Sequence, residues 1–316
     1  MQIRPLGAEV LDDFVEAAGS PDDRKEVEQY LKAMFAAGSM RPEWCFVAQV
    51  EGGRPVGRVA FWTLPGMEQP FALVLLDVSW DDQAGVGTRL LEDVLDRART
   101  LGAGEIEHVI DAPPMAPQFQ YHREQRIELL QSIGFAFRRE TGRFEWHGKQ
   151  PPAKPERLSF RTLEETGEEA FLDAMMRVSE GTLDREIRGE RERLGAWRAA
   201  REFFEDAQGV KHEPSWWRLA YAPCGELAGL VMPAEPPGFL TIFYIGVLPG
   251  MRGHGYVDDL LAAGTATLLE AQKGAGKEKP LLTDTDVANA PMASAFERAG
   301  WTRFAGRREY VMDLTP

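Results

Sequence analysis

The sequence has little cysteine and no excess of positive charge. Cys45 and Cys224 are the only two cysteines among its 316 residues, so a disulfide framework is excluded and no metal-ligand spacing is present. Both lie beside strand-like segments, which predicts buried thiols. The formal net charge of −14 provides no basic face for a phosphate backbone, which argues against nucleic acid as a partner. We therefore expect neither a metal site nor a nucleic-acid interface.

Long hydrophobic runs are also missing. A membrane-spanning helix needs about 20 consecutive apolar residues, and the sequence contains no such stretch. Residues 1–6 lead directly into polar sequence and lack the pattern of a secretory signal. We therefore expect a cytoplasmic protein without a membrane partner. The Gly-Lys-Ser/Thr signature of a nucleotide-binding loop is absent as well, which argues against ATP as the ligand of a glycine-rich turn.

A proline-rich polar segment, residues 150–157, divides the chain near its middle. Its composition is typical of a linker, and the chain length favours two domains, so we predict domains over residues 1–149 and 158–316. Each half has the same predicted order of elements, which indicates an α/β fold of two tandem domains, each a twisted mixed β-sheet flanked by helices. The first half has predicted strands at 2–4, 45–50, 55–63, 71–78, 105–110 and 136–146, and helices at 11–18, 22–37, 87–101 and 125–132. The second half has predicted strands at 158–162, 216–221, 226–232, 239–247, 281–285 and 303–313, and helices at 168–180, 185–205, 256–271 and 291–299.

The most informative segment is the turn between the predicted strand at 239–247 and the predicted helix at 256–271. Pro249 ends the strand, and Gly253 and Gly255 allow backbone N–H groups to crowd together at the helix N-terminus. The partial positive charge there attracts an anion, and Arg252 adds a full charge beside it. These features predict a site for a diphosphate group, with an ordinary strand-to-helix turn as the alternative.

A second segment, residues 283–301, reads as a strand followed by a helix. It contains Asn289-Ala-Pro-Met292 and ends in Gly300-Trp301. Together with Arg252-Gly-His-Gly-Tyr-Val257, it resembles the GCN5-related N-acetyltransferase superfamily. The turn is similar to that family's acyl-CoA pyrophosphate loop, Gln/Arg-x-x-Gly-x-Gly/Ala, and the second segment is similar to its later strand-and-helix motif. The resemblance covers residues 158–316 well and residues 1–149 weakly.

The resemblance implies that the C-terminal domain transfers an acetyl group from acetyl-CoA to a primary amine of a small molecule by direct attack. It also implies that the loop amides hold the cofactor's diphosphate and that the preceding strand pairs through its backbone with the pantetheine arm. The Val247 N–H would then polarise the acetyl carbonyl, and Asn289 would meet the cofactor arm. The implied cofactor-binding residues are Ile245, Val247, Arg252, Gly253, His254, Gly255, Tyr256, Val257 and Asn289.

Two residues of the C-terminal half depart from the family pattern. Val257 stands where the loop normally has glycine or alanine, and a β-branched side chain there would crowd the diphosphate. Phe296 stands where many members carry a tyrosine that protonates the leaving thiolate. Phenylalanine has no such proton, so the acid must be another group or solvent.

The N-terminal half shows a complementary loss. Its loop is Asp82-Gln-Ala-Gly85-Val-Gly87, in which Asp82 replaces the arginine and would repel a phosphate. Arg123 stands where the other half has Asn289. We interpret residues 1–149 as a degenerate transferase domain that supports the structure or shapes the substrate site, with retained acyl-CoA binding as the alternative.

An attacking ammonium must lose a proton, which requires a base or a water chain near the strand at 239–247. Alternation along residues 241–244 leaves one of Ile242 and Tyr244 facing the site. Tyr244 is thus a candidate acid or water-orienting residue, with a half-buried sheet aromatic as the alternative. Asp284 and Asp286 lie on one face at the end of the next strand. They are candidates for holding a cationic acceptor or relaying a proton, and Asp286 alternatively caps the following helix.

Two functions of different classes are consistent with these residues. The first is a tandem N-acetyltransferase whose partner is a small-molecule amine. The alternative is a non-catalytic acyl-CoA-binding or interaction protein made of two decayed domains, which Asp82, Val257 and Phe296 favour. We expect a monomer or a homodimer.

Overall fold

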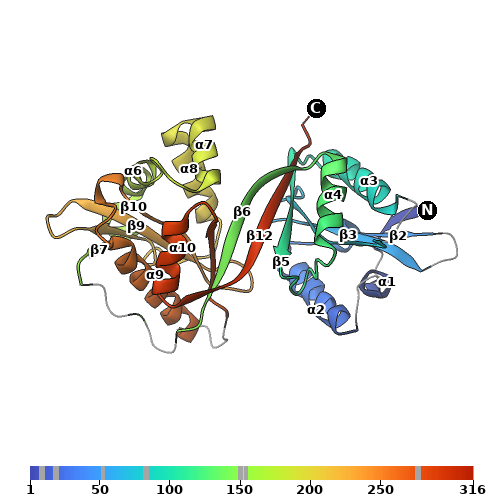
Figure 1. Cartoon of the computed structure of the whole chain (residues 1–316), viewed down its shortest axis with the longest axis horizontal. Coiled ribbons are helices and arrows are strands. Elements are labelled where there is room, and N and C mark those ends of the chain that lie inside the picture. The colour runs from blue at the N-terminus through green and yellow to red at the C-terminus, as the bar shows by residue number, and fades with distance from the viewer. Residues whose placement is uncertain are drawn as a thin grey trace. The chain divides into compact units, whose positions relative to one another are not determined.

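The computed structural model of the chain describes residues 1–6, 11–16, 21–50, 54–80, 85–148, 152, 156–274 and 279–315. The chain forms two compact units (Figure 1). Unit 1 comprises Met1–Arg139 and Gly306–Pro316, and unit 2 comprises Glu140–Ala305. The predicted linker at 150–157 lies largely outside the described residues, and the division into domains at 1–149 and 158–316 stays a prediction.

The two halves of the chain repeat one order of strands and helices, which confirms the predicted α/β fold class. The first half contains β1 (Gln2–Pro5), α1 (Leu11–Glu16), α2 (Pro21–Ala37), η1 (Pro42–Trp44), β2 (Cys45–Gln49), β3 (Pro55–Trp62), β4 (Ala72–Val78), α3 (Val86–Thr100), β5 (Glu105–Ala112), α4 (Arg123–Ile133) and β6 (Ala136–Trp146). The second half contains β7 (Ser159–Thr162), α5 (Leu163–Thr166), α6 (Glu168–Val178), α7 (Arg185–Leu194), α8 (Ala196–Gln208), β8 (Arg218–Tyr221), β9 (Leu227–Ala234), β10 (Thr241–Val247), η2 (Pro249–Met251), α9 (Tyr256–Gly274), β11 (Leu282–Asp286), α10 (Ala290–Arg298) and β12 (Trp301–Asp313).

The last strand of each half contributes to both units. In unit 1 the strands β1-β2-β3-β4-β5 continue into β12, whose residues 306–313 pair antiparallel with β5. In unit 2 the strands β10-β9-β8-β7 form an antiparallel sheet, and β11 pairs antiparallel with residues 141–145 of β6. Strand β6 therefore begins in unit 1 and ends in unit 2, whereas β12 does the reverse. This exchange is why the compact units do not coincide with the two sequence halves.

Apolar side chains cover both faces of each sheet, because neighbouring residues of a strand point to opposite faces. In unit 1, Val47 of β2 packs with α1 and α2, whereas Phe46 packs with α3. In unit 2, Leu230 of β9 packs with α6 and α8, whereas Val231 packs with α9 and α10. Each unit is thus a sheet with helices on both sides.

Two local predictions are wrong. The predicted helix at 185–205 is divided at Gly195, whose φ of +82° is a conformation that glycine adopts most readily. Asp184 caps the first part, α7, by accepting hydrogen bonds from two backbone N–H groups. Cys224 is exposed in the turn between β8 and β9, whereas Cys45 is buried as predicted.

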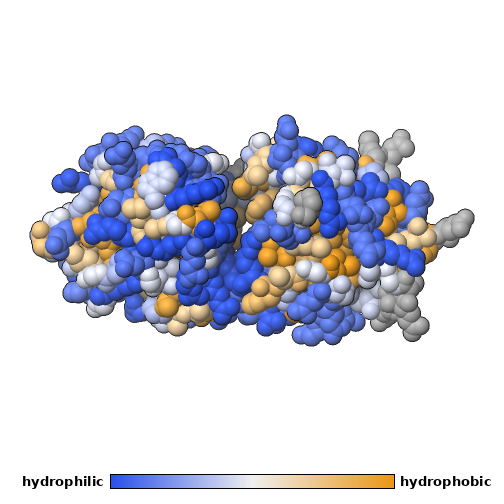
Figure 2. Space-filling model, turned by 90° about the horizontal axis from the view of Figure 1, so that it is seen from above, coloured by the Kyte–Doolittle hydropathy of each residue, from blue (hydrophilic) through white to orange (hydrophobic). Residues whose placement is uncertain are grey.

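The described helices include none that is long and apolar enough to cross a membrane. Within the same residues, no group of His, Cys, Asp and Glu side chains is arranged to hold a metal ion. The face of the molecule in Figure 2 is largely hydrophilic, with smaller hydrophobic patches between the polar residues, in keeping with a net charge of −14.

Candidate functional site

Strands β10 and β11 run side by side only at their first residues. The Leu282 N–H donates to the Leu240 carbonyl (2.9 Å), and the Thr283 hydroxyl donates to the Ile242 carbonyl (3.2 Å). On its other side β10 stays paired with β9 to its end, where the Leu248 N–H donates to the Ala228 carbonyl (2.9 Å). Because backbone groups alternate along a strand, the N–H groups of residues 245 and 247 point away from β9. They face the side on which β11 diverges.

A bulge between Ile242 and Tyr244 changes the alternation of side chains along β10. Phe243 and Tyr244 both pack with α6 and α8, while Ile245 and Val247 pack with α9. The strict alternation used on the sequence is therefore wrong at this point. Its consequence is that two neighbouring aromatic side chains lie on one face.

Tyr244 lies in this aromatic cluster, and only 8% of its surface is exposed. Its ring lies 4.9 Å from that of Phe203 on α8. Burial raises the pKa of its hydroxyl well above the ordinary value, and the negative charge of Asp184 raises it further. Among the described residues the hydroxyl has no hydrogen-bond partner. Tyr244 is thus a sheet aromatic, and it also presents a protonated, unpaired donor.

The turn after β10 has the glycine geometry that the sequence predicts. Gly253 and Gly255 have φ values of +84° and +74°, which side chains other than glycine rarely adopt. Helix α9 begins directly afterwards at Tyr256. His254 is exposed, and its ring stacks on that of Tyr256 at a centroid distance of 5.7 Å. The turn thus places successive backbone amides at the start of a long helix.

Arg252 binds backbone carbonyls instead of pointing freely into solvent. Its Nη2 donates to the carbonyls of Val178 (3.0 Å) and Glu180 (2.8 Å), and its Nη1 donates to that of Gly181 (3.2 Å). Its Nε donates to the carbonyl of Val247 at 3.2 Å. The guanidinium therefore joins the end of α6 to the end of β10. The sequence gave no signal for these contacts, and direct contact of Arg252 with a diphosphate stays a prediction.

Replacing Arg252 by lysine is expected to lower the free energy of unfolding by about 2 kcal/mol, nearly as much as replacing it by alanine. An ammonium is a single point of charge and does not reach carbonyls of α6 and β10 in a fork. Thermal unfolding of R252K and R252A measures this difference. A lysine variant as stable as the wild type would show that only the charge of Arg252 matters.

Two carboxylates lie in the first turn of α9, and each is paired with an arginine from elsewhere. Arg298 binds Asp258 at 2.8 Å, and Arg157 binds Asp259 at 2.9 Å. Arg157 also donates to the carbonyls of residues 254 (2.9 Å) and 255 (2.8 Å). The sequence analysis missed Arg157 because it assigned residue 157 to the linker.

The two departures from the family pattern both belong to the core of unit 2. Val257 is half-buried and packs against the apolar cluster under α9 and α10, so its methyl groups point into the core. Phe296 is 1% exposed, and its ring lies 5.2 Å from that of Phe144 and 5.8 Å from that of Trp301. Phe296 is therefore a packing residue.

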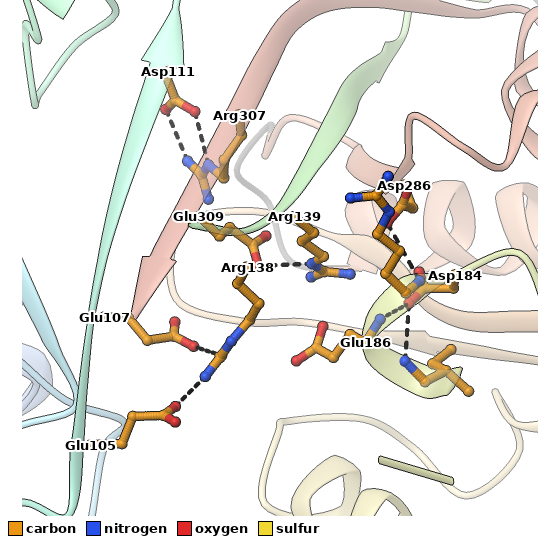
Figure 3. A network of polar contacts seen from close by, with 12 residues as sticks. Glu105, Glu107, Asp111, Arg138, Arg139, Asp184, Glu186, Asp286, Arg307 and Glu309 are labelled. Atoms are coloured by element: carbon orange, nitrogen blue, oxygen red, sulfur yellow. Dashed lines mark hydrogen bonds and ion pairs between the residues drawn. The ribbon is translucent and has the colours of Figure 1, made fainter. Parts of the chain in front are cut away.

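Asp284 and Asp286 have different surroundings. Asp286 is fully buried, and its carboxylate accepts from the N–H groups of Ala288 (2.7 Å) and Arg185 (3.4 Å), so it fastens the start of α7 to β11 (Figure 3). Asp284 is exposed on the same strand. Asn289 is the N-terminal capping residue of α10, but its side chain makes no capping hydrogen bond.

The corresponding strands of unit 1, β4 and β5, also diverge after a short parallel pairing at residues 72–73 with 107–108. Here the space between the strands is bridged by side chains from the connection to α4. The Gln118 carbonyl oxygen accepts from the Leu75 N–H at 2.6 Å. The Gln120 side chain accepts from the Asp111 N–H (2.8 Å) and donates to the carbonyl of residue 109.

Arg126 of α4 completes this bridge. Its guanidinium donates to the carbonyls of Leu76 and Tyr121 and forms an ion pair with Asp77 at 2.9 Å. Both diverging strands of unit 1 therefore have backbone groups bonded to the unit's own side chains. Asp82, which the sequence analysis named in the loop of this half, lies outside the described residues. Gly85 precedes α3 with a φ of +67°.

A cleft of about 540 Å³ lies on unit 2 beside the end of β10. Its walls are Arg177, Glu180, Glu226, Leu227 and residues 248–251. The predicted catalytic residues Tyr244, Asp284 and Asp286 are not among these walls, so the cleft is a neighbour of the turn and not the candidate site itself.

No known protein-family profile matches the sequence, and no curated protein matches it either. Three solved structures are similar to the chain. A GCN5-related N-acetyltransferase from Sphaerobacter thermophilus has a TM-score of 0.62 and 15% identity, over 100% of this chain and 96% of that one. A tandem GNAT protein from the clavulanic acid biosynthesis pathway has a TM-score of 0.51 and 16% identity, over 100% and 99%. A GCN5-related glucosamine N-acetyltransferase region of a fungal multi-domain β-N-acetylglucosaminidase has a TM-score of 0.56 and 16% identity, over 98% and 38%. These similarities confirm the predicted fold.

Proposed function

From the tandem GCN5-related N-acetyltransferase fold, we propose that this chain transfers an acetyl group from acetyl-CoA to a primary amine of a small molecule, with its site in unit 2. The observation that carries the proposal is the contrast between the two pairs of diverging strands. In unit 2 the N–H groups of Ile245 and Val247 point toward the divergence. In unit 1 the corresponding space is bridged by Gln118, Gln120 and Arg126.

The residues of unit 2 fit acetyl-CoA, which supplies the activated thioester when bound. The amides of residues 253–257 would hold the diphosphate at the start of α9, and the edge of β10 at Ile245 and Val247 would pair with the pantetheine arm. The Asn289 side chain, which makes no capping bond, is available to the same arm. Val257 is compatible with this arrangement because its side chain packs into the core.

Three side chains have proposed roles in the transfer. Tyr244 stays protonated because burial raises its pKa, so it acts as a hydrogen-bond donor to the reacting groups. Asp284 is exposed, and it receives the proton of the attacking ammonium through solvent. Asp286 is a positioning residue, since both of its oxygens are bonded to backbone N–H groups that fix α7.

Unit 1 is proposed to be a degenerate domain that binds no acyl-CoA. The backbone groups that a pantetheine arm would use are already bonded to Gln118, Gln120 and Arg126, and displacing these side chains would leave buried polar groups unpaired. A cytoplasmic location and a monomeric or homodimeric state remain predictions from the sequence.

A matched pair of glycine substitutions tests the location of the site. Gly253 and Gly85 both have positive φ values, +84° and +67°, and open space beside the missing side chain, so aspartate causes similar strain at both. We expect Gly253→Asp to weaken acetyl-CoA binding by at least about tenfold, because its carboxylate repels the diphosphate. Gly85→Asp is expected to leave binding unchanged. Isothermal titration of both variants, with a wild-type stoichiometry of one, measures this.

Two results of this titration would count against the proposal. Two binding sites per chain, or weaker binding by Gly85→Asp, would place acyl-CoA in unit 1. No binding by the wild-type chain would remove the acyl-CoA site altogether.

The alternative function is a non-catalytic acyl-CoA-binding protein, which the aromatic core position of Phe296 favours. Release of the CoA thiol in the presence of a panel of primary amines separates the two functions. An amine-dependent release that falls in a Tyr244→Phe variant supports the enzyme. Binding of acetyl-CoA combined with release no faster than the amine-free blank, for every amine, supports the binding protein.

A further inference from the structure

Arg157 lies directly before β7, far along the sequence from the turn at residues 252–257, yet its side chain lies against that turn. One face of the guanidinium binds the carbonyls of His254 and Gly255, at 2.9 and 2.8 Å, and its Nε lies 2.9 Å from a carboxylate oxygen of Asp259. Its charge also lies 5.8 Å from the centre of the Tyr256 ring. One side chain from outside the turn thus contacts four consecutive or near-consecutive residues of it.

These contacts determine which way two peptide groups point. In a trans peptide the carbonyl of one residue and the N–H of the next point in opposite directions. Because Arg157 holds the carbonyls of His254 and Gly255 on its own side, the N–H groups of Gly255 and Tyr256 point to the other side. Glycine at position 255 leaves the backbone free to rotate, so an external contact is needed to fix this orientation.

The same side chain compensates a charge that would oppose an anion. Asp259 is 9% exposed and lies in the first turn of α9, where its negative charge would repel a diphosphate bound at the helix N-terminus. Asp258 beside it is already paired with Arg298. Without Arg157, the carboxylate of Asp259 would lose its ion-pair partner close to the proposed diphosphate site.

We propose that Arg157 is a positioning residue of the diphosphate-binding turn. It orients the N–H groups of Gly255 and Tyr256 toward the ligand side and neutralises Asp259, and it does both from the opposite side of the turn. This inference rests on the proposed function, since it assigns a role within the acyl-CoA site of unit 2.

Titration with CoA, the probe of the diphosphate site, tests the role. Arg157→Ala is expected to weaken CoA binding by about tenfold and to raise the KM for acetyl-CoA while leaving the KM for the amine unchanged. Arg161→Ala is the matched control, because Arg161 lies on β7 and its guanidinium is placed over the Tyr221 ring instead of the turn. Arg161→Ala is expected to bind CoA as the wild type does. Arg157 is half-exposed, so both variants are expected to fold, and their circular dichroism checks this.

The two parts of the role are separated by the double variant Arg157→Ala with Asp259→Asn. If neutralising Asp259 were the whole role, the second substitution would restore CoA binding fully. We expect partial restoration, because the two carbonyls remain unbound and the amides at 255 and 256 remain free to reorient. In two-dimensional NMR spectra, the backbone amide signals of these residues should shift in Arg157→Ala and not in Arg161→Ala.

The failures of this inference and of the proposed function are distinguishable. If the wild type binds CoA and Arg157→Ala binds it equally well, the positioning role is overturned and the acyl-CoA site stands. If Asp259→Asn restores binding fully, the orientation of the amides is overturned. If the wild type binds no CoA, the proposed function fails, and the role of Arg157 fails with it.

Discussion

Lowering the pH from 6.5 to about 4 is expected to reduce the free energy of unfolding of unit 1 by about 3 kcal/mol through His108 alone. His108 is 1% exposed, and burial lowers its pKa from the ordinary 6.5 to about 4. The nearby positive charge of Arg126 lowers the pKa as well, whereas the contact with the Leu73 carbonyl and the charge of Asp111 oppose the shift. The folded unit therefore holds a neutral imidazole, whose Nδ1–H donates to Leu73 at 2.9 Å.

The sign follows from which state takes up the proton first. The unfolded chain protonates its histidine near pH 6.5, whereas the folded unit resists protonation until about pH 4. Between these values the unfolded state binds more protons, so stability falls as the pH falls. The contribution of neutral His108 is complete above pH 6.5 and is lost progressively below it.

A glutamine at position 108 isolates this effect. It donates a hydrogen bond to the Leu73 carbonyl and does not titrate, so the H108Q variant is expected to lose about 3 kcal/mol less than the wild type across the same pH range. Urea unfolding at several pH values between 4 and 7.5 provides the comparison. Parallel losses in wild type and variant would show that other groups cause the acid sensitivity of unit 1.

The sequence predicts the elements of the fold because the signals for them are local. The apolar face of α9, the glycines at 253 and 255 and Pro249 each act within a few residues, and the structure has a turn and a helix at those positions. The order of strands and helices in each half follows in the same way. The exchange of closing strands is not visible, because β12 has the same pattern whichever strand it pairs with.

The candidate site is predicted less completely because its contacts join distant parts of the chain. Arg252 has the spacing of a loop arginine, but its partners Val178, Glu180 and Gly181 belong to the end of another helix. Arg157 has the composition of a linker around it. The face of Tyr244 depends on a bulge that no residue of β10 announces. In each case the sequence names the residue type, and the tertiary structure decides its partner.

The inward-facing groups of unit 1 illustrate the same limit. Gln118 and Gln120 lie in a segment without hydrophobic periodicity, which the sequence analysis left unassigned. Their amides are bonded to backbone groups of β4 and β5, where the other unit has diverging strands. Two glutamines in a loop carry no signal of this kind, because the same residues are common on exposed surfaces.

Replacing Arg126 by methionine is expected to destabilise unit 1 by about 3–5 kcal/mol, the largest single effect among these predictions. The guanidinium is fully buried, it forms an ion pair with Asp77, and it donates to the carbonyls of Leu76 and Tyr121. Methionine fills a similar volume, but it leaves a partly buried carboxylate and two carbonyls without their donor. Unfolding in urea measures the loss, and Arg97→Met is the control. Arg97 pairs with Asp93 on the exposed face of α3, and such a pair contributes less than about 1 kcal/mol.

A double variant identifies the source of the Arg126 effect. If the unpaired charge of Asp77 dominates, Arg126→Met combined with Asp77→Asn should recover about half of the lost stability. If the two carbonyls dominate, the second substitution should recover little. Equal stability of Arg126→Met and the wild type would contradict both readings and would mean that unit 1 does not need its bridge between β4 and β5. The diverging strands of unit 1 would then be free to open, and the assignment of the only acyl-CoA site to unit 2 would lose its physical basis.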